Sequence, residues 1–225
     1  MKPGREIEVR RLGVVPYADG LELQRELVER RKVGKISDQL LLLEHPPVIT
    51  LGVKTHSDRS HVVATPQTLE DEGVEVFESG RGGDVTYHGP GQLVGYPILD
   101  LRPDRCDVHR YVRDLEEVLI RTAAAFGIAA GRTPGLTGAW VGDEKLAAIG
   151  VRIARWITSH GFALNVSTNL SHFGLIVPCG ISDKGVTSLE RLLARPVAVA
   201  DVETAVIDAF CGVFDAKATA LTHLK

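Results

Sequence analysis

One glycine-rich stretch divides the sequence and guides the interpretation of both halves. It reads Arg81-Gly82-Gly83-Asp84-Val85-Thr86-Tyr87-His88-Gly89-Pro90-Gly91-Gln92-Leu93. Six glycines and one proline lie between Gly80 and Gly95, too many for the interior of a helix or a strand. The pattern predicts a loop dominated by its backbone that runs into a strand near 92–98.

The segments around this loop predict a mixture of helices and strands. An apolar run over 39–44 is typical of a strand buried on both faces, and 48–52 is expected to continue the same sheet. Helical spacing predicts helices over about 20–32, with a capping box at Asp19, over 108–126, and after an N-cap at Asp201. A short helix is expected over 66–72. Further strands are expected over 74–77, 139–141, 146–153, 156–157 and 162–166, with a hairpin turn at Gly142-Asp143.

These elements do not alternate as in a doubly wound fold. We therefore expect the α+β class, a mixed α/β arrangement in which a mixed or antiparallel sheet is flanked by helices. A length of 225 residues suits a single domain over 1–225.

Composition excludes several functions. The net charge of -3 argues against nucleic-acid binding, which needs a basic face. No apolar run reaches 18 residues and the first residues lack the apolar segment of a signal peptide, so we expect a cytoplasmic protein without membrane contact. Cys106, Cys179 and Cys211 are widely spaced and odd in number, which fits neither a disulfide framework nor a metal site. One of these three cysteines could therefore be a reactive thiol.

The glycine-rich stretch suits a ligand cradle. Glycines let a ligand approach backbone N–H groups, and Arg81 and His88 can hydrogen-bond a carbonyl or a phosphate. The stretch is not a Walker phosphate-binding loop, because no Gly-Lys-Ser/Thr follows it, and the GxGxxG dinucleotide-binding motif is absent. The alternative is a structural glycine turn without a ligand.

Several motifs together resemble one enzyme family. They are Leu43-Glu44-His45-Pro46-Pro47-Val48, the stretch from Arg81 to Leu93, Lys145-Leu146-Ala147-Ala148-Ile149-Gly150-Val151, His160-Gly161-Phe162-Ala163-Leu164-Asn165-Val166 and Val177-Pro178-Cys179-Gly180-Ile181. In order and spacing they resemble the octanoyl-carrier-protein:protein octanoyltransferases, also called lipoyl/octanoyl transferases. The resemblance spans roughly 40–190.

The resemblance implies a fold, a reaction and a site. The fold would be that of the biotin and lipoate protein ligases. Octanoyl would pass from octanoyl-acyl carrier protein to a lysine of the lipoyl domains of 2-oxoacid dehydrogenase E2 subunits or of the glycine-cleavage H protein, without ATP, metal or cofactor. Cys179 would be the acyl-thioester nucleophile, and Lys145 its activating partner and proton shuttle. The acyl site would comprise Arg81, Gly82, Gly83, Asp84, Val85, Thr86, Tyr87, His88, Ala148, Ile149, Gly150, Gly161, Phe162 and Ala163.

Residue chemistry supports the two catalytic roles independently. A thioester acceptor must be a thiolate, which a nearby ammonium such as that of Lys145 stabilises. Cys179 lies between Pro178 and Gly180, a setting that suits an exposed turn, and the Gly180 N–H could bind an oxyanion. Cys106 and Cys211 are expected to be ordinary small side chains.

Alternatives stay open for single residues and for the whole chain. Lys145 at a hairpin edge could be a solvated lysine, and His88 could contact the acyl group or brace the loop. His45 is expected to hydrogen-bond at a strand end, and His160 to support the site. The rival functions are an ATP-dependent lipoate or biotin ligase, which would need no cysteine, and a non-enzymatic acyl-binding module.

Overall fold

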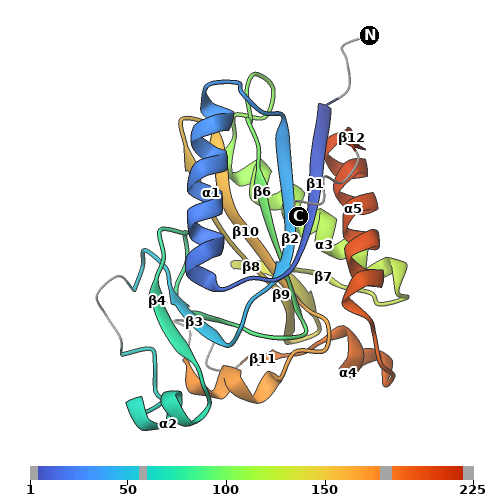
Figure 1. Ribbon diagram of the computed structural model, residues 1–225. Coiled ribbons are helices and arrows are strands. Elements are labelled where there is room, and N and C mark those ends of the chain that lie inside the picture. Colours follow the sequence, from blue (N-terminus) through green and yellow to red (C-terminus); the bar gives the residue numbers. More distant parts are fainter. Residues whose placement is uncertain (1–4, 56–59, 178–183, 220–225) are drawn as a thin grey trace.

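The fold is built on a large mixed sheet, described here from a computed structural model over residues 5–55, 60–177 and 184–219 (Figure 1). Its strands follow the order β12-β1-β2-β6-β10-β9-β8-β7, and β11 pairs with β9. They are β1 (Arg5–Val14), β2 (Asp38–Glu44), β6 (Gln92–Ile98), β7 (Gly131–Thr133), β8 (Leu136–Val141), β9 (Glu144–Ala154), β10 (Ile157–Asn165), β11 (Gly185–Val186) and β12 (Ala216–Thr219). The β1–β2, β1–β12 and β9–β11 pairs are parallel and the others antiparallel.

Helices cover both faces of this sheet. The described helices are α1 (Tyr17–Lys32), α2 (Pro66–Asp71), α3 (Val108–Ala125), α4 (Leu189–Leu193) and α5 (Val199–Phe214), with a 3₁₀ helix, η1, at Leu170–Leu175. Of these, α2 and η1 pack instead against a separate core around Ile49 and Leu51. Figure 1 shows α1 on one side of the sheet and α3 with α5 on the other. The predicted mixed sheet flanked by helices is confirmed.

The central strand β2 is buried on both faces, as its apolar run predicted. Leu40 and Leu42 pack into the core beneath α3 and α5, whereas Leu41 and Leu43 pack into the core beneath α1. Successive side chains of a strand point to opposite faces, so four consecutive leucines serve both cores. The central strand thereby holds the two helical layers together.

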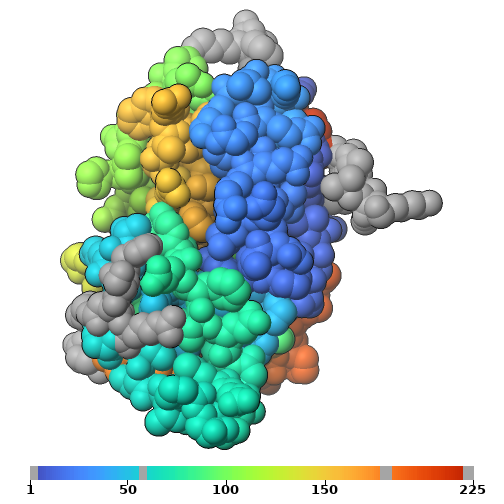
Figure 2. All heavy atoms as spheres, turned by 60° about the vertical axis from the view of Figure 1, so that its left-hand side comes forward, coloured from blue at the N-terminus to red at the C-terminus, as the bar shows by residue number. Residues whose placement is uncertain are grey.

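The expectation that 48–52 continues this sheet is wrong. Strand β3 (Val48–Leu51) lies between β4 (Glu75–Glu78) and β5 (Thr86–His88) in a separate three-stranded sheet. Pro46 and Pro47 end the pairing of β2, because proline fixes φ and lacks an N–H. Figure 2 shows the segment that carries this small sheet, in cyan to green, below α1 on the surface.

The predicted strand-end role of His45 is confirmed. Its Nδ1 lies 2.6 Å from the carbonyl oxygen of Val15 and its Nε2 lies 2.7 Å from the hydroxyl of Tyr96, and the ring is fully buried. His45 thereby ties the start of α1 to β6 at the corner where the chain leaves the large sheet.

Two helix starts differ from the predictions. Helix α1 begins at Tyr17 after Pro16 and α5 begins at Val199 after Ala198, and neither has a side-chain cap. Asp19 and Asp201 lie in the first turns instead. A carboxylate is favourable anywhere in the first turn because it faces the positive end of the helix dipole, so an acidic residue locates a helix start only to within a turn.

Other elements agree with or extend the expectations. Helix α2, helix α3 and the β8–β9 hairpin are confirmed, and the structure adds an N-cap at Asp107 for α3. The two short strands expected over 156–157 and 162–166 form the single strand β10, and β1 and β12 were not predicted. No helix among the described residues is long and apolar enough to cross a membrane.

Candidate active site

A cavity of about 1000 Å³ lies where the glycine-rich loop faces β9 and β10. It gathers nearly all of the described residues that the sequence nominated. They are Arg81, Gly82, Gly83, Asp84, Val85, Thr86, His88, Lys145, Ala148, Ile149, Gly150, Gly161, Phe162 and Ala163. They belong to three separate segments of the sequence, 81–88, 145–150 and 161–163, and the fold brings these segments together at the cavity.

Tyr87 is the exception, since it points away from this cavity. Its hydroxyl lies 2.7 Å from Nδ1 of His172, its ring packs edge-on against Phe173, and burial raises its pKa to about 12. Thr86 and His88 on either side face the cavity because side chains alternate along β5. Tyr87 therefore joins β5 to η1 and does not contact a ligand in the cavity.

Backbone hydrogen bonds fix the glycine-rich loop on two sides. The N–H groups of Gly52 and Lys54 donate to the carbonyls of Asp84 and Gly83 at 3.1 and 3.2 Å, and the Gly82 N–H donates to the Val151 carbonyl at 2.9 Å. The Gly82 N–H is therefore occupied by β9 and is not available to a ligand. The N–H of Gly83 has no acceptor among the described residues, so it is a donor that this loop could offer to a ligand.

Arg81 is buried and braces the loop. Its Nη2 donates to the Thr50 carbonyl at 2.6 Å and to the Thr50 hydroxyl at 2.8 Å, while Nη1 donates to the Gly82 carbonyl at 3.2 Å. Burial lowers the pKa of the guanidinium, and no carboxylate of the described residues lies within ion-pair distance. Arg81 therefore places a positive charge at the cavity wall that no direct ion pair among the described residues neutralises, although the more distant Asp84 carboxylate favours it.

His88 is neutral, and its hydrogen bonds define its tautomer. Burial, with nearby His45 and Arg81, lowers its pKa to about 3. Its Nδ1 lies 2.7 Å from Oε1 of Gln92, whose Nε2 donates to the Tyr87 carbonyl and to Asn165, so Nδ1 carries the proton. The Nε2 atom is then an acceptor facing the Thr50 hydroxyl at 3.5 Å. In this tautomer His88 lines the cavity but has no N–H to offer a thioester carbonyl.

His160 is a cavity residue that the sequence placed only in support. It has a left-handed backbone with φ of 54°, and its N–H donates to Oε1 of Gln24 on α1 at 2.7 Å. Burial and the nearby Arg81 and Arg152 lower its pKa to about 4. Tyr17 and Tyr96 also line this part of the cavity, and no sequence motif indicated them.

Gly161 lines the cavity for a reason that concerns the sheet. A Cβ on Gly161 would lie 2.2 Å from the carbonyl oxygen of Gly95 and 2.6 Å from Pro97 on the neighbouring strand. Gly95 in turn makes room for the ring of Phe162, which would lie 2.1 Å from a Cβ there. The two glycines let β6 and β10 pack closely beneath the cavity.

Lys145 is the second residue of β9, and its side chain lines the cavity. The side chain is half-buried, and burial lowers its pKa to about 8. A lysine of this kind populates both protonation states near neutral pH, as a proton-transfer group needs. The half-burial of Lys145 in the cavity favours a site residue over the solvated-lysine alternative.

The proposed nucleophile Cys179 lies in 178–183, outside the described residues. The residues that flank this segment, Val177 and Lys184, both line the cavity. The Val177 N–H donates to the His61 carbonyl at 2.8 Å, and β11 runs parallel to the start of β9 with Val186 beside Lys145. Both residues that flank 178–183 therefore lie at the cavity wall.

The other two cysteines do not line this cavity. Cys106 is exposed, Cys211 is half-buried on α5, and burial raises the pKa of Cys211. Among the residues that the structure describes, no cluster of His, Cys, Asp and Glu could hold a metal ion.

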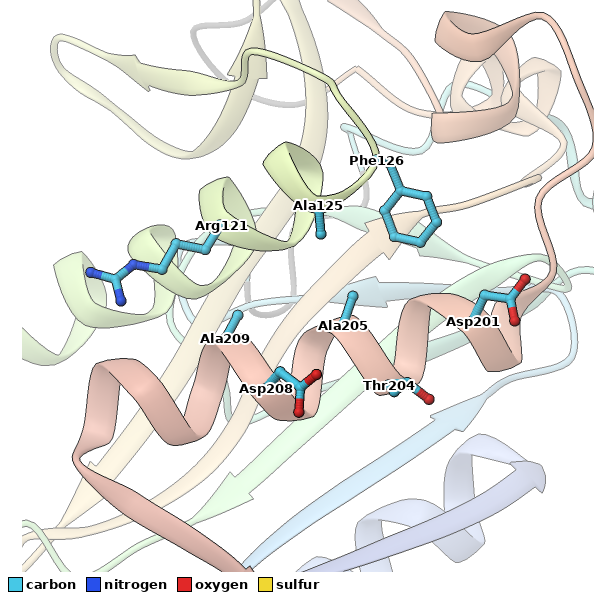
Figure 3. A pocket seen from close by; sticks show the side chains of 8 residues that line it. All are labelled: Arg121, Ala125, Phe126, Asp201, Thr204, Ala205, Asp208 and Ala209. Atoms are coloured by element: carbon cyan, nitrogen blue, oxygen red, sulfur yellow. The ribbon is translucent and has the colours of Figure 1, made fainter.

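A second hollow of about 420 Å³ lies between α3 and α5 (Figure 3). Arg121, Phe126 and Asp208 contribute to its lining, and no residue nominated for the site is present. Neither a cysteine nor a lysine lines this hollow, so the large cavity is the candidate active site.

Solved structures define the fold class. Lipoate-protein ligase A bound with ATP matches with a TM-score of 0.76 at 15% identity, covering 97% of this chain and 90% of that one. The biotin protein ligase from Aquifex aeolicus matches with a TM-score of 0.54 at 13% identity, over 92% of this chain and 70% of that one. The fold is therefore that of the lipoate and biotin protein ligases, as predicted.

Sequence relatives define the family. The model of the lipoyl protein ligase A/B catalytic domain matches residues 16–211, so the chain belongs to that family. Proteins named octanoyltransferase are 55% identical in Myxococcus xanthus, over 94% of this chain, and 55% identical in Rubrobacter xylanophilus, over 91%. The chain spans 60% of the length of the first relative and 92% of the second. The predicted family resemblance is confirmed.

Proposed function

We propose that this chain is an octanoyltransferase that moves octanoyl from octanoyl-acyl carrier protein to a lysine of lipoyl domains, acting as a single catalytic domain over 1–225. The acceptors would be the lipoyl domains of 2-oxoacid dehydrogenases and the glycine-cleavage H protein. Relatives 46–59% identical that bear the name octanoyltransferase support the reaction. The observation in the fold that carries the proposal is Lys145, half-buried in a cavity that the glycine-rich loop lines.

In the first half-reaction the Cys179 thiolate attacks the carbonyl carbon of the donor thioester. The bond to the carrier sulfur breaks, and the carrier thiolate leaves and takes up a proton. The acyl group is then a thioester on Cys179. Because one thioester replaces another, the step is close to neutral in free energy and needs no ATP.

In the second half-reaction the acceptor lysine attacks the acyl-enzyme as a neutral amine. The new amide bond forms, the Cys179 sulfur leaves, and the amine loses one proton. An amide is more stable than a thioester, so this step runs downhill.

Lys145 is the group we assign to the proton transfers. As an ammonium it favours the thiolate of the nucleophile and can protonate the leaving carrier thiolate. As a neutral amine it can take the proton from the incoming lysine. The pKa of about 8 makes both forms accessible near neutral pH.

The loop contributes binding rather than proton transfer. The Gly83 N–H, which no described residue accepts, is available to the substrate, and Ala148, Ile149 and Phe162 present apolar surface to an acyl chain. Arg81 holds the loop in place through Thr50.

The test is the intact mass of the protein after incubation with octanoyl-acyl carrier protein. The proposal expects one octanoyl adduct, which hydroxylamine removes because it is a thioester. Adding a lipoyl domain should discharge the adduct onto that domain. The rival ATP-dependent ligase would instead catalyse ATP–pyrophosphate exchange with octanoate, and an acyl-binding module would form no covalent adduct. Either outcome would refute the transferase.

A further inference from the structure

A β-bulge at the start of β9 determines where the Lys145 side chain points. Ala139 pairs with Ala147 and Trp140 pairs with Lys145, so Leu146 has no partner on β8. Side chains alternate along a regular strand, so without the extra residue Lys145 would share a face with Ala147. Leu146 and Ala147 are both buried in the core. The bulge directs Lys145 to the cavity instead.

Strand β8 is fixed opposite this bulge. Gly138 has φ of 121°, and a Cβ there would lie 2.3 Å from the Ala147 carbonyl oxygen. Its N–H donates at 3.1 Å to Oε1 of Glu116, a fully buried carboxylate on α3 that also pairs with Arg113 and Arg132. The backbone around Trp140 is therefore held rigidly relative to α3.

Trp140 faces Lys145 across this bulge. The Lys145 Nζ lies 4.8 Å from the centroid of the Trp140 ring, within the range of a cation–π interaction, for which tryptophan is the best ring. Trp140 is buried and is not part of the cavity lining. Its indole N–H has no acceptor among the described residues, so hydrogen bonding does not account for a tryptophan at this place. The contact between the indole ring and the Lys145 ammonium accounts for a tryptophan at this position.

The charged groups near Lys145 are engaged with other partners. Glu144 pairs with Arg191 at 3.3 Å and Asp143 pairs with Lys184. Within the described part of the chain, no carboxylate lies within ion-pair distance of Lys145, and burial lowers its pKa. Among the described groups, the ring face of Trp140 is the one in contact that favours the ammonium form.

We propose that Trp140 is a positioning residue for Lys145, whose ring face holds the ammonium at the bulge and aims it into the cavity. The inference rests on the proposed function, because the position of Lys145 matters for turnover only if this lysine assists acyl transfer. Trp140 acts through Lys145 and does not contact the substrate.

Two substitutions separate the ring face from the bulk of the side chain. Trp140→Leu keeps an apolar side chain but removes the π face, so the ammonium loses the interaction that offsets its burial. The pKa of Lys145 should fall by about one unit, a tenfold change in proton affinity. Trp140→Phe keeps a ring and should restore most of the native value. Trp140→Phe also removes the buried indole N–H, which has no hydrogen-bond acceptor among the described residues.

The readout is the titration of the Lys145 amine, followed by NMR in protein labelled at its lysine side chains. The Lys145 resonance is assigned by its absence from Lys145→Ala. A matched control is Trp156→Leu, which removes the other tryptophan at the partly exposed β9–β10 turn and should leave the titration unchanged. The pH–rate profile of acylation should shift with the amine titration in Trp140→Leu.

Distinct outcomes test the inference and the proposed function separately. An unaltered Lys145 titration in Trp140→Leu would overturn the positioning role, whatever the turnover. A native protein that forms no acyl adduct would refute the transferase, while the titration would still test Trp140. If Trp140→Leu does not fold, Trp140→Met offers a similar length without a ring, and equal titrations in Trp140→Met and Trp140→Phe would contradict the inference.

Discussion

The N–H of Gly82 donates to the carbonyl of Val151 at 2.9 Å, which fastens the glycine-rich loop to β9. A Cβ on Gly150, the residue before Val151, would lie 2.9 Å from the Gly82 carbonyl oxygen and 3.0 Å from Cδ of Arg81. The loop thus lies directly on the strand. The shape of the cavity depends on how closely these two backbones approach.

Gly83→Val should slow acylation more than it weakens folding. Gly83 has φ of 91°, a conformation that a β-branched residue rarely adopts, and a Cβ would lie at ordinary contact distance, 3.5 Å, from Arg81 Nη1. The strain should therefore rotate the backbone and move the Gly83 N–H out of the cavity. We expect at least a tenfold lower single-turnover rate with octanoyl-acyl carrier protein.

The matched control is Gly73→Val in the turn after α2. Gly73 also has a positive φ, 61°, and open space around it, but it does not line the cavity. Both variants should lose similar stability, on the order of 1–2 kcal/mol. Equal acylation rates for the two variants would mean that the loop is only a structural turn.

Gly150→Ala should change the shape of the cavity, although Gly150 itself has no positive φ that alanine would strain. The new methyl group would press on the Gly82 carbonyl and lift the loop from β9, so the hydrogen bond from Gly82 to Val151 should lengthen. We expect a higher KM for octanoyl-acyl carrier protein, measured by initial rates. Gly131→Ala on β7, where a Cβ meets no atom within 4 Å, should leave KM unchanged, and an equal effect of both would refute the explanation.

Local patterns predicted the elements whose signals are contained within one segment. The periodicity of α3 required only neighbouring residues, and so did the hairpin between β8 and β9. Strands β1 and β12 escaped prediction because they pair with each other across most of the chain, and β1 is rich in charged residues. The separate sheet of β3 likewise depends on pairing with β4 and β5.

Sequence motifs predicted which residues belong to the site, but not how each side chain is oriented. The motifs nominated the residues that now line the cavity, but spacing could not show that Tyr87 faces η1 and not the cavity, or that Gly82 already donates to β9. Trp140 went unnoticed because its contact with Lys145 arises from a bulge, which is a property of register. Pairing register is decided by the whole sheet and not by a local pattern.

Cys179→Ser should abolish the octanoyl adduct. A serine hydroxyl is far harder to ionise than a thiol, so the attack on a thioester should fall by several orders of magnitude. The measurement is intact mass after incubation with octanoyl-acyl carrier protein, with Cys106→Ser and Cys211→Ser as controls that keep the adduct. Transfer at the native rate by Cys179→Ser would show that another residue is the nucleophile.

Lys145→Ala should make Cys179 less reactive at neutral pH. Loss of a nearby cation raises the pKa of a thiol, so a smaller fraction would be thiolate. We expect the pH profile of iodoacetamide alkylation to move upward in a background where Cys106 and Cys211 are replaced. Lys35→Ala, which removes an exposed lysine outside the cavity, is the control. The same profile in Lys145→Ala and the native enzyme would place Lys145 away from the thiol.

Lys145→Met should stabilise the folded protein at neutral pH, because burial lowers the pKa of Lys145 from 10.5 to about 8. Below pH 8 the native fold must bury an ammonium, which costs up to about 3 kcal/mol. Between pH 8 and 10.5 the unfolded chain binds more protons than the folded one, so the stability of the native protein rises through this window. The advantage of Lys145→Met should therefore be largest below pH 8 and fade toward pH 10.5. Urea unfolding at a series of pH values measures it, with the exposed Lys35→Met expected to show no such trend. A Lys145→Met variant that is less stable than the native protein by the same amount at every pH would show that the cavity does not penalise the ammonium.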